Sequence, residues 1–247
     1  MEHSSERRFV DLHTHILPGV DDGAENLETA LEMLQRAWEN GTGTLFLTPH
    51  YRGRYKKNTP QHLREIFDEL SRKASERFPE LRLYLGHEAG NEHELADKLL
   101  SGRVMTLGGT CYVLLEFDEH CYRSGVLSSI LNLINSGYIP VIAHVERYEI
   151  FRKNHSLAGE VINMGAMLQV NAGSVMGRHG LGVKLYCQKL LRRGQIHFVA
   201  SDAHDLKDRP PVLNACFARI SKRYGRDYAQ AVFAGNAERI LSESDHL

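Results

Sequence analysis

The sequence predicts an α/β fold: a barrel of seven parallel strands in which helices separate successive strands. Two observations predict this fold. The strand-like stretches are short and apolar without strict alternation, as is typical of parallel strands that are buried on both faces. Each is followed by a stretch with helical spacing of apolar residues. The length of 247 residues is one at which α/β barrels form a single domain, so we expect residues 1–247 to be one domain.

The first half of the chain begins with a strand at 9–12 and a helix at 26–40, whose apolar residues recur every three or four positions up to Gly41. A buried strand at 44–48 then precedes a helix at 60–78, which carries Leu63, Phe67 and Leu70 on one face. A strand at 81–86 follows, and residues 91–107 are expected to form a short helix and a loop.

The second half repeats this alternation. Strands are expected at 111–115, 138–143, 166–170 and 196–200, with helices at 126–135, 155–164 and 182–193 between them. Gly194 ends the last of these helices in the way that is common at helix C-termini. Two or three further helices are expected to complete the chain.

Composition excludes several classes of protein. The 30 basic and 31 acidic residues give a net charge of -1, which provides no overall field for nucleic acid or anionic lipid. No apolar run reaches the length of a membrane span, and the polar residues 1–8 are not followed by a signal-peptide apolar stretch, so we expect a cytoplasmic protein without a membrane span. The four cysteines include no C-x-x-C pair, which argues against a disulfide framework or a zinc knuckle.

The first strand leads into His13 and His15, which the two-residue period of a strand places on one face. The Pro18-Gly19 turn then brings Asp22 back over them. Two imidazoles and a carboxylate form half of a metal site. The motif is short, however, and two histidines that only satisfy backbone groups at a strand end would look the same.

Residues that can bind metals recur just after the ends of six of the seven expected strands. Because the carboxyl ends of the strands of a β/α barrel meet on one face, we expect these side chains to converge there. The candidates are His13, His15, Asp22, His50, Glu88, Glu116, His144, Asp202 and His204. One such residue after one strand is unremarkable, but this recurrence is hard to assign to chance.

The candidate ligands are five histidines and four carboxylates without a thiolate, a set that favours manganese, iron or zinc over a structural cysteine site. Nine ligands are too many for one ion, so two or three ions are implied, with Glu88 or Glu116 as a bridge. A site with several metal ions lowers the pKa of bound water and stabilises the oxygens of an in-line displacement at phosphorus. Hydrolysis of a phosphate ester is the reaction that this chemistry favours.

Two arginines lie beside the expected ligands, and the planar guanidinium of arginine suits bidentate contact with phosphate. Arg147 follows His144, and Arg209 follows His204. We take Arg147, Arg209, Asp202 and His204 as the catalytic candidates, although each arginine could instead form a surface salt bridge. Asp11 and Asp21 flank the opening histidines and are expected to orient imidazoles.

Three further features lie outside the expected set of ligands. The loop 52–57 is basic and contains Tyr55, so it could guide an acidic peptide or single-stranded nucleic acid, but we expect a solvated loop. Cys187 and Arg193 match the C-x5-R spacing of cysteine-dependent phosphatases. The residues between them contain no glycine and lie in a helical stripe, so a phosphate-binding loop is not expected there. His87 should point away from Glu88 because neighbouring strand residues alternate.

Six segments together resemble the PHP (polymerase and histidinol phosphatase) superfamily, and most closely its bacterial manganese-dependent protein-tyrosine phosphatases of capsule and exopolysaccharide systems. The segments are DLHTHILPGVDDG (11–23), TPH (48–50), GHE (86–88), LEF (115–117), AHVERY (143–148) and SDAH (201–204). The resemblance runs in order from about residue 9 to 243. It implies a distorted, TIM-like barrel of seven strands with three metal ions.

The resemblance also implies which residues bind each ion. His13, His15, Glu88 and Asp202 would bind the first. Glu88, Glu116 and His144 would bind the second, so that Glu88 bridges two ions, and Asp22, His50 and His204 would bind the third. Arg147 and Arg209 match the positions that bind phosphate in the superfamily. The implied cofactor is manganese.

The implied activity is hydrolysis of phosphotyrosine on protein, with the tail of a bacterial tyrosine autokinase that regulates exopolysaccharide synthesis as the expected partner. One alternative keeps the metals and changes the substrate to histidinol phosphate or nucleic acid, although the neutral net charge argues against nucleic acid. Another is a non-catalytic binding module of polysaccharide assembly, against which the complete set of ligands argues.

Overall fold

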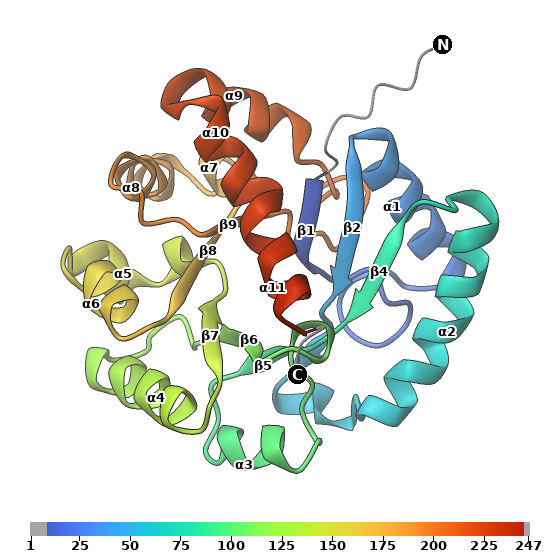
Figure 1. Cartoon of the computed structure of the whole chain (residues 1–247), viewed down its shortest axis with the longest axis horizontal. Coiled ribbons are helices and arrows are strands. Elements are labelled where there is room, and N and C mark those ends of the chain that lie inside the picture. The colour runs from blue at the N-terminus through green and yellow to red at the C-terminus, as the bar shows by residue number, and fades with distance from the viewer. Residues whose placement is uncertain (1–8, 245–247) are drawn as a thin grey trace.

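The computed structural model describes residues 9–244 and shows two curled parallel sheets surrounded by helices (Figure 1). The first sheet has the order β1-β2-β4, with β1 (Phe9–Thr14), β2 (Thr42–Leu47) and β4 (Arg82–Leu85). The second has the order β3-β5-β6-β7-β8-β9, with β3 (His50–Tyr51), β5 (Glu88–Gly90), β6 (Tyr112–Glu116), β7 (Ile139–Ile142), β8 (Met167–Asn171) and β9 (Phe198–Ala200). A parallel bridge between Thr14 and Ala203 connects the two sheets, so the predicted parallel α/β fold is confirmed.

The sheets differ from the expected seven strands at two breaks in the chain. β2 is followed after Thr48 and Pro49 by the short strand β3, and β4 is followed after Gly86 and His87 by β5. Pro49 has no N–H to donate to a strand partner. At Gly86 a Cβ atom would lie 2.9 Å from the carbonyl oxygen of Thr106, so the chain bends close against that loop. As a result β2 pairs with β4, whereas β3 pairs with β5.

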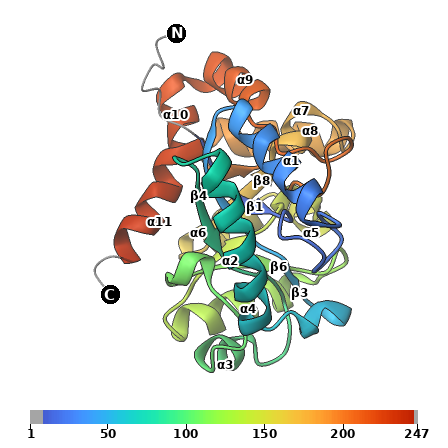
Figure 2. The same cartoon turned by 90° about the vertical axis from the view of Figure 1, so that its right-hand side faces the viewer.

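Helices cover the outside of the sheets (Figures 1 and 2). The longer ones are α1 (Leu27–Glu39), α2 (Pro60–Arg77), α4 (Arg123–Asn135), α8 (Leu181–Arg192), α9 (Asn214–Tyr224) and α11 (Asn236–Ser244). The shorter ones are α3 (Leu95–Leu100), α5 (Glu149–Lys153), α6 (Leu157–Asn163), α7 (Ala172–Met176), α10 (Arg226–Gln230), the 3-10 helices η1 (Gly53–Lys57), η2 (Leu107–Gly109) and η3 (Val145–Arg147), and the π-helical turn η4 (Ala231–Gly235).

The predicted helices have recognisable start signals. The side chain of Asn26 accepts a hydrogen bond from the N–H of Thr29 at the start of α1. Thr59 caps α2 in the same way, with Pro60 as the first helical residue. Two helices in the barrel region, α5 and α7, were not expected because five residues are too few to show a helical period.

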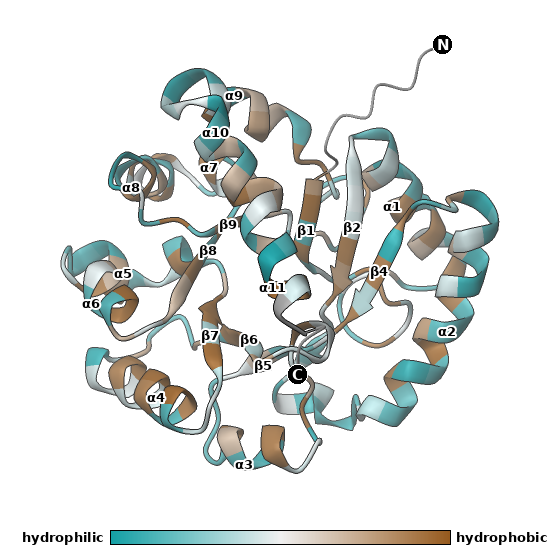
Figure 3. Ribbon diagram, in the orientation of Figure 1, coloured by the Kyte–Doolittle hydropathy of each residue, from teal (hydrophilic) through white to brown (hydrophobic). Residues whose placement is uncertain are grey.

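Apolar side chains pack against both faces of the strands, and β1 and β7 accordingly appear mostly brown in Figure 3. In β6, Val113 and Leu115 belong to the same apolar cluster as residues of α4, whereas Tyr112 and Leu114 belong to an interior cluster. That interior cluster includes Ile240 of α11, which crosses the barrel in Figure 1. Apolar residues thus close the barrel near the beginnings of the strands, and the opposite end carries the polar residues described below.

Among residues 9–244, none of the helices combines the length and the apolar character that crossing a bilayer requires. The expectation that the chain has no signal peptide concerns residues 1–8, which lie outside the described residues.

Candidate metal centre

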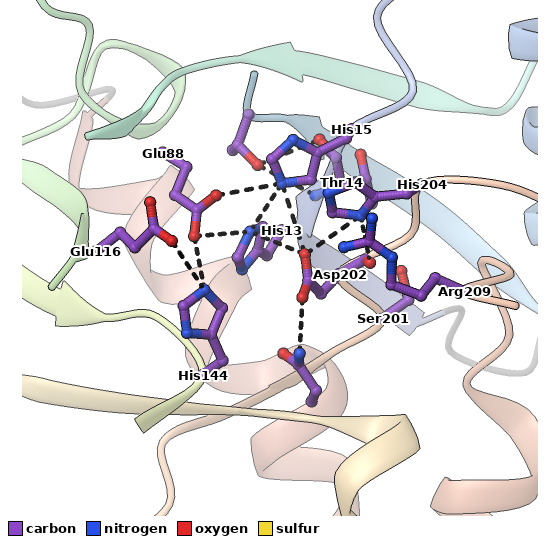
Figure 4. Close-up of polar contacts among 12 residues, drawn as sticks. His13, Thr14, His15, Glu88, Glu116, His144, Ser201, Asp202, His204 and Arg209 are labelled. Carbon is purple, nitrogen blue, oxygen red and sulfur yellow. Dashed lines mark hydrogen bonds and ion pairs between the residues drawn. The ribbon is translucent and has the colours of Figure 1, made fainter. Parts of the chain in front are cut away.

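The nine predicted metal-binding residues lie together at one end of the barrel, and Figure 4 shows side chains of most of them pointing toward one another. Glu116 is the last residue of β6, and His144 and Asp202 follow β7 and β9, as expected. His50 and Glu88 instead begin the short strands β3 and β5, where they are direct partners in the parallel pairing. The two chain breaks therefore bring these two side chains to the polar end.

The four residues implied for the first ion are mutual neighbours. The Nε2 atoms of His13 and His15 lie 3.2 Å apart, so the predicted shared face is confirmed. Each of these atoms lies 3.3 Å from an oxygen of Glu88. The Oδ1 atom of Asp202 lies 3.4 Å from His13 Nε2 and 3.5 Å from His15 Nε2.

The other two implied sets are also sets of neighbours. His144 Nε2 lies 2.8 Å from Glu88 Oε1 and 3.9 Å from Glu116 Oε1. The Oδ1 atom of Asp22 lies 3.4 Å from His50 Nε2 and 3.6 Å from His204 Nε2. His50 Nδ1 additionally lies 2.8 Å from Glu88 Oε2, so the third set adjoins the first two.

The ring nitrogens of three histidines in the cluster are arranged as in metal-binding histidines. His13 donates its Nδ1–H to the side-chain oxygen of Gln169, and His15 donates its Nδ1–H to Asp21. His204 donates its Nδ1–H to the carbonyl oxygen of Asp202. In each case the other ring nitrogen, Nε2, faces the cluster with its lone pair, which is the usual arrangement of a metal-binding histidine.

Several buried atoms of the cluster also lack a hydrogen-bond partner within the described part of the chain. They are His50 Nδ1, Glu88 Oε2, Glu116 Oε2 and His144 Nδ1. His50 Nδ1 lies 2.8 Å from Glu88 Oε2, and Glu116 Oε2 lies 2.7 Å from Arg52 Nη1, but neither contact has the geometry of a hydrogen bond. Buried polar atoms are normally paired, so a group of unpaired ones needs an explanation. Candidate ligand atoms lie within 4.8 Å of one another in three groups, which share residues: His15, Asp22, His50 and His204; His13, His15 and Glu88; and His50, Glu88 and Glu116. Divalent ions at these positions would satisfy the atoms of His50, Glu88 and Glu116.

The carboxylates give the cluster a strong affinity for positive charge. Burial raises the pKa of Glu88, but the charges of His13 and His50 outweigh burial and hold its pKa well below the usual range. For Asp202, burial is likewise outweighed by nearby histidines, and the pKa falls to about 2. Burial lowers the pKa of His50, but the charge of Glu88 and its other carboxylate neighbours raise it to about 11.

The two aspartates that flank the opening histidines have different roles. Asp21 Oδ2 lies 2.7 Å from His15 Nδ1 and also accepts the backbone N–H of His50, so the prediction that Asp21 orients an imidazole is confirmed. For Asp11 the prediction is wrong, because its hydrogen-bond partner is the backbone N–H of Ser201. The turn closes tightly over His15, since a Cβ atom on Gly23 would lie 1.8 Å from the carbonyl oxygen of His15.

Two amides of β8 support the cluster and were missed in the sequence. Gln169 Oε1 accepts the backbone N–H of His144 at 2.7 Å, and its amide donates to Asn171 Oδ1. Asn171 in turn donates to Asp202 Oδ2 at 2.7 Å. The sequence did contain a signal for them: Gln169 and Asn171 are two amides in an otherwise apolar strand. Their two-residue spacing places both side chains on the same face of that strand.

Backbone strain marks two of the candidate ligands. His144 and Asp202 have φ angles of 32° and 54°, and Glu94 is the one further non-glycine residue with positive φ in the range 9–244. Such left-handed conformations are costly for residues with a Cβ atom and cluster at functional sites. Each residue is the second after the end of a strand, β7 or β9, and the left-handed conformation accompanies the turn of its side chain into the cluster.

Four arginines line a cavity of about 290 Å³ above the cluster. Arg147 Nη1 lies 3.7 Å from Asp202 Oδ2, and Arg209 Nη2 lies 3.9 Å from Asp22 Oδ2, so both predicted arginines face the candidate ligands. Arg52 and Arg54 also line this cavity, together with Tyr55. Arg52 and Tyr55 are partly buried, so the prediction of a solvated loop is wrong for these two residues, whereas Arg54 is exposed, as predicted.

The remaining polar candidates lie elsewhere. Cys187 is fully buried in α8, and burial raises the pKa of its thiol, so it has the structural role that the sequence predicts. His87 points away from Glu88, as expected, and contacts the backbone of Asn58 and Met105.

Comparisons with known proteins agree with the geometry. A family model described as capsular polysaccharide synthesis, CpsB/CapC, matches residues 9–242. The tyrosine-protein phosphatase YwqE of Bacillus subtilis is 34% identical over 234 residues, which cover 94% of this chain and 91% of that protein. The tyrosine-protein phosphatase CpsB of Streptococcus pneumoniae is 30% identical over 240 residues, which cover 95% of this chain and 99% of that protein.

Solved structures show the same relation. A structure from a study of YwqE from Bacillus subtilis and CpsB from Streptococcus pneumoniae, described as unique metal-dependent tyrosine phosphatases, has a TM-score of 0.89 at 33% identity and 94% coverage of both chains. A histidinol phosphate phosphatase from Lactococcus lactis has a TM-score of 0.56 at 12% identity, with 93% of this chain and 98% of that chain covered, and shares the fold alone. The chain belongs to the CpsB/CapC family of capsular polysaccharide synthesis.

Proposed function

We propose that the chain is a metal-dependent protein-tyrosine phosphatase. The observation that carries this proposal is the convergence of nine imidazole and carboxylate side chains beneath a cavity lined by arginines. Four of these side chains are carboxylates, which would repel a phosphate group unless cations lay between them. The proposal therefore needs metal ions for substrate binding as well as for the reaction.

The residues fit two or three divalent ions. We assign His13, His15, Glu88 and Asp202 to the first ion. Glu88, Glu116 and His144 would bind the second, and Asp22, His50 and His204 the third. When bound, such ions supply an activated water at neutral pH and stabilise charge on phosphoryl oxygens. The absence of thiolate ligands favours manganese or iron, with zinc also possible, and we propose manganese.

The proposed role of the arginines is to bind the phosphoryl group. Arg147 lies beside Asp202, and Arg209 lies beside Asp22. The two guanidinium groups would hold the phosphoryl oxygens by bidentate contacts. They would orient phosphorus above the ions and stabilise the charge of the transition state. Because the phenol of tyrosine has a pKa near 10, its phenolate leaves without much help from an acid, and the proposal assigns no general acid.

The partner that we propose is a bacterial tyrosine autokinase whose phosphorylated tail regulates capsule or exopolysaccharide synthesis. Because such a kinase uses ATP, we propose the cytoplasm as the site of action. We also propose that residues 1–247 act as one phosphatase domain. In this domain β2 with β3 and β4 with β5 would count as two bent strands of a seven-stranded barrel.

Other substrates are less well supported. Two cations of the basic loop are already engaged, because Arg52 lies 2.7 Å from Glu116 Oε2 and Lys56 lies 3.0 Å from Glu92 Oε1. This pairing weakens the case for a track that binds nucleic acid. The likeness to a histidinol phosphate phosphatase is limited to the fold.

The test compares hydrolysis of a phosphotyrosine peptide, a phosphoserine peptide, histidinol phosphate and a short oligonucleotide, each with manganese and with chelator. We expect manganese-dependent release of phosphate, fastest from the phosphotyrosine peptide. Equal rates in chelator would overturn the metal requirement. A preference for any of the other three substrates would overturn the assignment of phosphotyrosine, and no hydrolysis at all would leave a binding module as the better account.

A further inference from the structure

A second cavity, of about 320 Å³, adjoins the cavity of the candidate metal centre. Asp202 and Arg209 line both cavities and so form the wall between them. Residues of α1, α7 and the beginning of α9 line the rest of the second cavity. A peptide with its phosphotyrosine above the metal centre would therefore have a neighbouring side chain within reach of this space.

The second cavity is cationic. Three arginines line it: Arg36 from α1, Arg178 from the loop after α7, and Arg209. His179 lines it as well, and the pKa of His179 is lowered by partial burial and by the positive charges of Arg147, Arg178 and Arg209. These positive charges disfavour the protonated form of the His179 imidazole.

Two of these cations are not neutralised by the protein. Within residues 9–244 no carboxylate oxygen lies within 4.0 Å of Arg36 or Arg178, and the guanidinium of Arg178 donates instead to the carbonyl oxygen of Asp208. The one acidic residue of the lining is Asp202. The Oδ1 atom of Asp202 faces His13 and His15, and its Oδ2 atom accepts a hydrogen bond from Asn171. Both carboxylate oxygens therefore have partners at the candidate metal centre.

The remaining lining is mostly apolar, with Ala172, Met176, Pro210 and Val212 among its residues. An incoming anion would meet three guanidinium groups and one carboxylate, that of Asp202, whose oxygens contact His13, His15 and Asn171. Apolar side chains would contact the carbon atoms of the anion. The net charge of the chain is only -1, so this concentration of positive charge is local. Such complementarity favours a negatively charged side chain.

We propose that this cavity is a second anion subsite, which binds a carboxylate or a phosphorylated side chain next to the phosphotyrosine in the substrate. The proposal rests on the proposed phosphatase function and adds a preference among phosphotyrosine peptides. Arg178 is its specificity-determining residue, because it lines the second cavity and not the first. A few partly exposed ion pairs of this kind correspond to about a tenfold gain in kcat/KM.

The test measures kcat/KM in manganese for three phosphotyrosine peptides that differ only at the neighbouring positions. These positions carry alanine, glutamate, or a phosphonate analogue of phosphotyrosine that cannot be hydrolysed. We expect both anionic peptides to exceed the alanine peptide by about tenfold, with the gain reduced at high salt. The glutamate and phosphonate arms show whether carboxylate or phosphate is preferred.

The variant Arg178→Gln removes the charge and keeps an amide that can donate to Asp208. We expect it to reduce the tenfold preference to less than about threefold, while the alanine peptide is hydrolysed at the wild-type rate. Arg226→Gln, at an exposed arginine of α10 that lines neither cavity, is the matched control and should keep the full preference.

The ratio between peptides is the readout, so a variant that lowers all rates equally contradicts the proposal. No preference in the wild-type protein, or a preference that survives Arg178→Gln, overturns the subsite and leaves the phosphatase activity standing. Failure of the proposed function is a different result: no manganese-dependent hydrolysis of any of the three peptides.

Discussion

His87 and Glu88 are neighbours in the chain and both are fully buried, yet they belong to different kinds of polar region. His87 donates from Nε2 to the carbonyl oxygen of Asn58 at 3.1 Å and accepts the N–H of Met105 at Nδ1 at 2.9 Å. The amide of Asn58 donates to the carbonyl oxygens of Val20 and His50. Both ring nitrogens of His87 are thus satisfied by backbone groups.

Glu88 shows the opposite pattern. Its two oxygens lie within 3.3 Å of the ring nitrogens of four histidines, yet Oε2 has no hydrogen-bond partner within the described residues. Burial lowers the pKa of His87 to about 4, whereas the charges around Glu88 outweigh burial and keep it ionised. A completed network indicates a structural role, and an incompletely paired cluster indicates a site for ligands. Substitutions one residue apart should therefore remove different properties.

The largest difference is expected in turnover. Glu88→Gln keeps the shape of the side chain but removes the proposed bridging charge, so phosphotyrosine hydrolysis should fall by about a thousandfold or more. Asp202→Ala should have the same effect, with an unchanged circular dichroism spectrum in both variants. His87→Gln is the matched control and should keep turnover within about tenfold of wild type. A Glu88→Gln variant with more than a tenth of wild-type turnover would remove the distinction between the two residues.

Stability should respond in the reverse order. His87→Ala leaves the carbonyl oxygen of Asn58 and the N–H of Met105 unpaired, and should lower the free energy of unfolding by about 3 kcal/mol. Urea denaturation measures this change as a lower midpoint at constant slope. A loss below about 0.5 kcal/mol would show that water or a shifted loop replaces the imidazole, and would contradict a structural role.

Metal binding should separate the two residues by thermal unfolding. Manganese at about 100 times its Kd should stabilise the wild-type protein by about 2.7 kcal/mol, or roughly 5–10 °C in Tm for a chain of this size. His87→Gln should show the same shift, and Glu88→Gln should show less than half of it. Equal shifts in both variants would place the bound ions outside the proposed cluster.

The pH dependence of stability should report His87. Its pKa is lowered to about 4 in the fold, so the unfolded chain binds more protons between pH 6.5 and 4, and stability falls as the pH falls through this range. Between pH 7 and 5 this contributes a loss of about 2 kcal/mol. Since glutamine does not titrate, His87→Gln should lose about 2 kcal/mol less than wild type over the same interval. Parallel curves for the two proteins would contradict the lowered pKa.

The smallest effect on turnover is expected at Cys187. Its thiol is buried and its pKa is raised, so it takes no part in the proposed reaction. Cys187→Ser should hydrolyse phosphotyrosine at the wild-type rate, measured well below its own melting temperature. Loss of activity in a folded Cys187→Ser protein would revive a thiol mechanism.

The sequence predicted the parts of the site that depend on strand ends. His13, Glu116, His144 and Asp202 lie where a parallel barrel places residues at or just after its strands. His50 and Glu88 were also predicted to join the cluster, but the short strands β3 and β5 that position them were not. The pairing of β3 with β5 brings His50 beside Glu88 through chain breaks that show no periodicity.

The contacts of the supporting polar groups were also hidden from the sequence. The hydrogen bonds from Gln169 to Asn171 and from Asn171 to Asp202 connect β8 to the loop after β9. The spacing of the two amides indicates a shared face of the strand, but it does not reveal Asp202 as their partner. The basic loop 52–57 was predicted to be solvated, but an ion pair with Glu116 holds Arg52 at the cavity. These are tertiary contacts, and local patterns do not encode them.

The central claim is that the cluster around Glu88 binds the ions on which phosphotyrosine hydrolysis depends. The most direct measurement follows bound metal and turnover together while protein stripped with chelator is titrated with manganese. We expect turnover to be negligible after stripping and to rise as two or three ions bind per chain. Full turnover by protein that retains less than about a tenth of an ion per chain would contradict the claim.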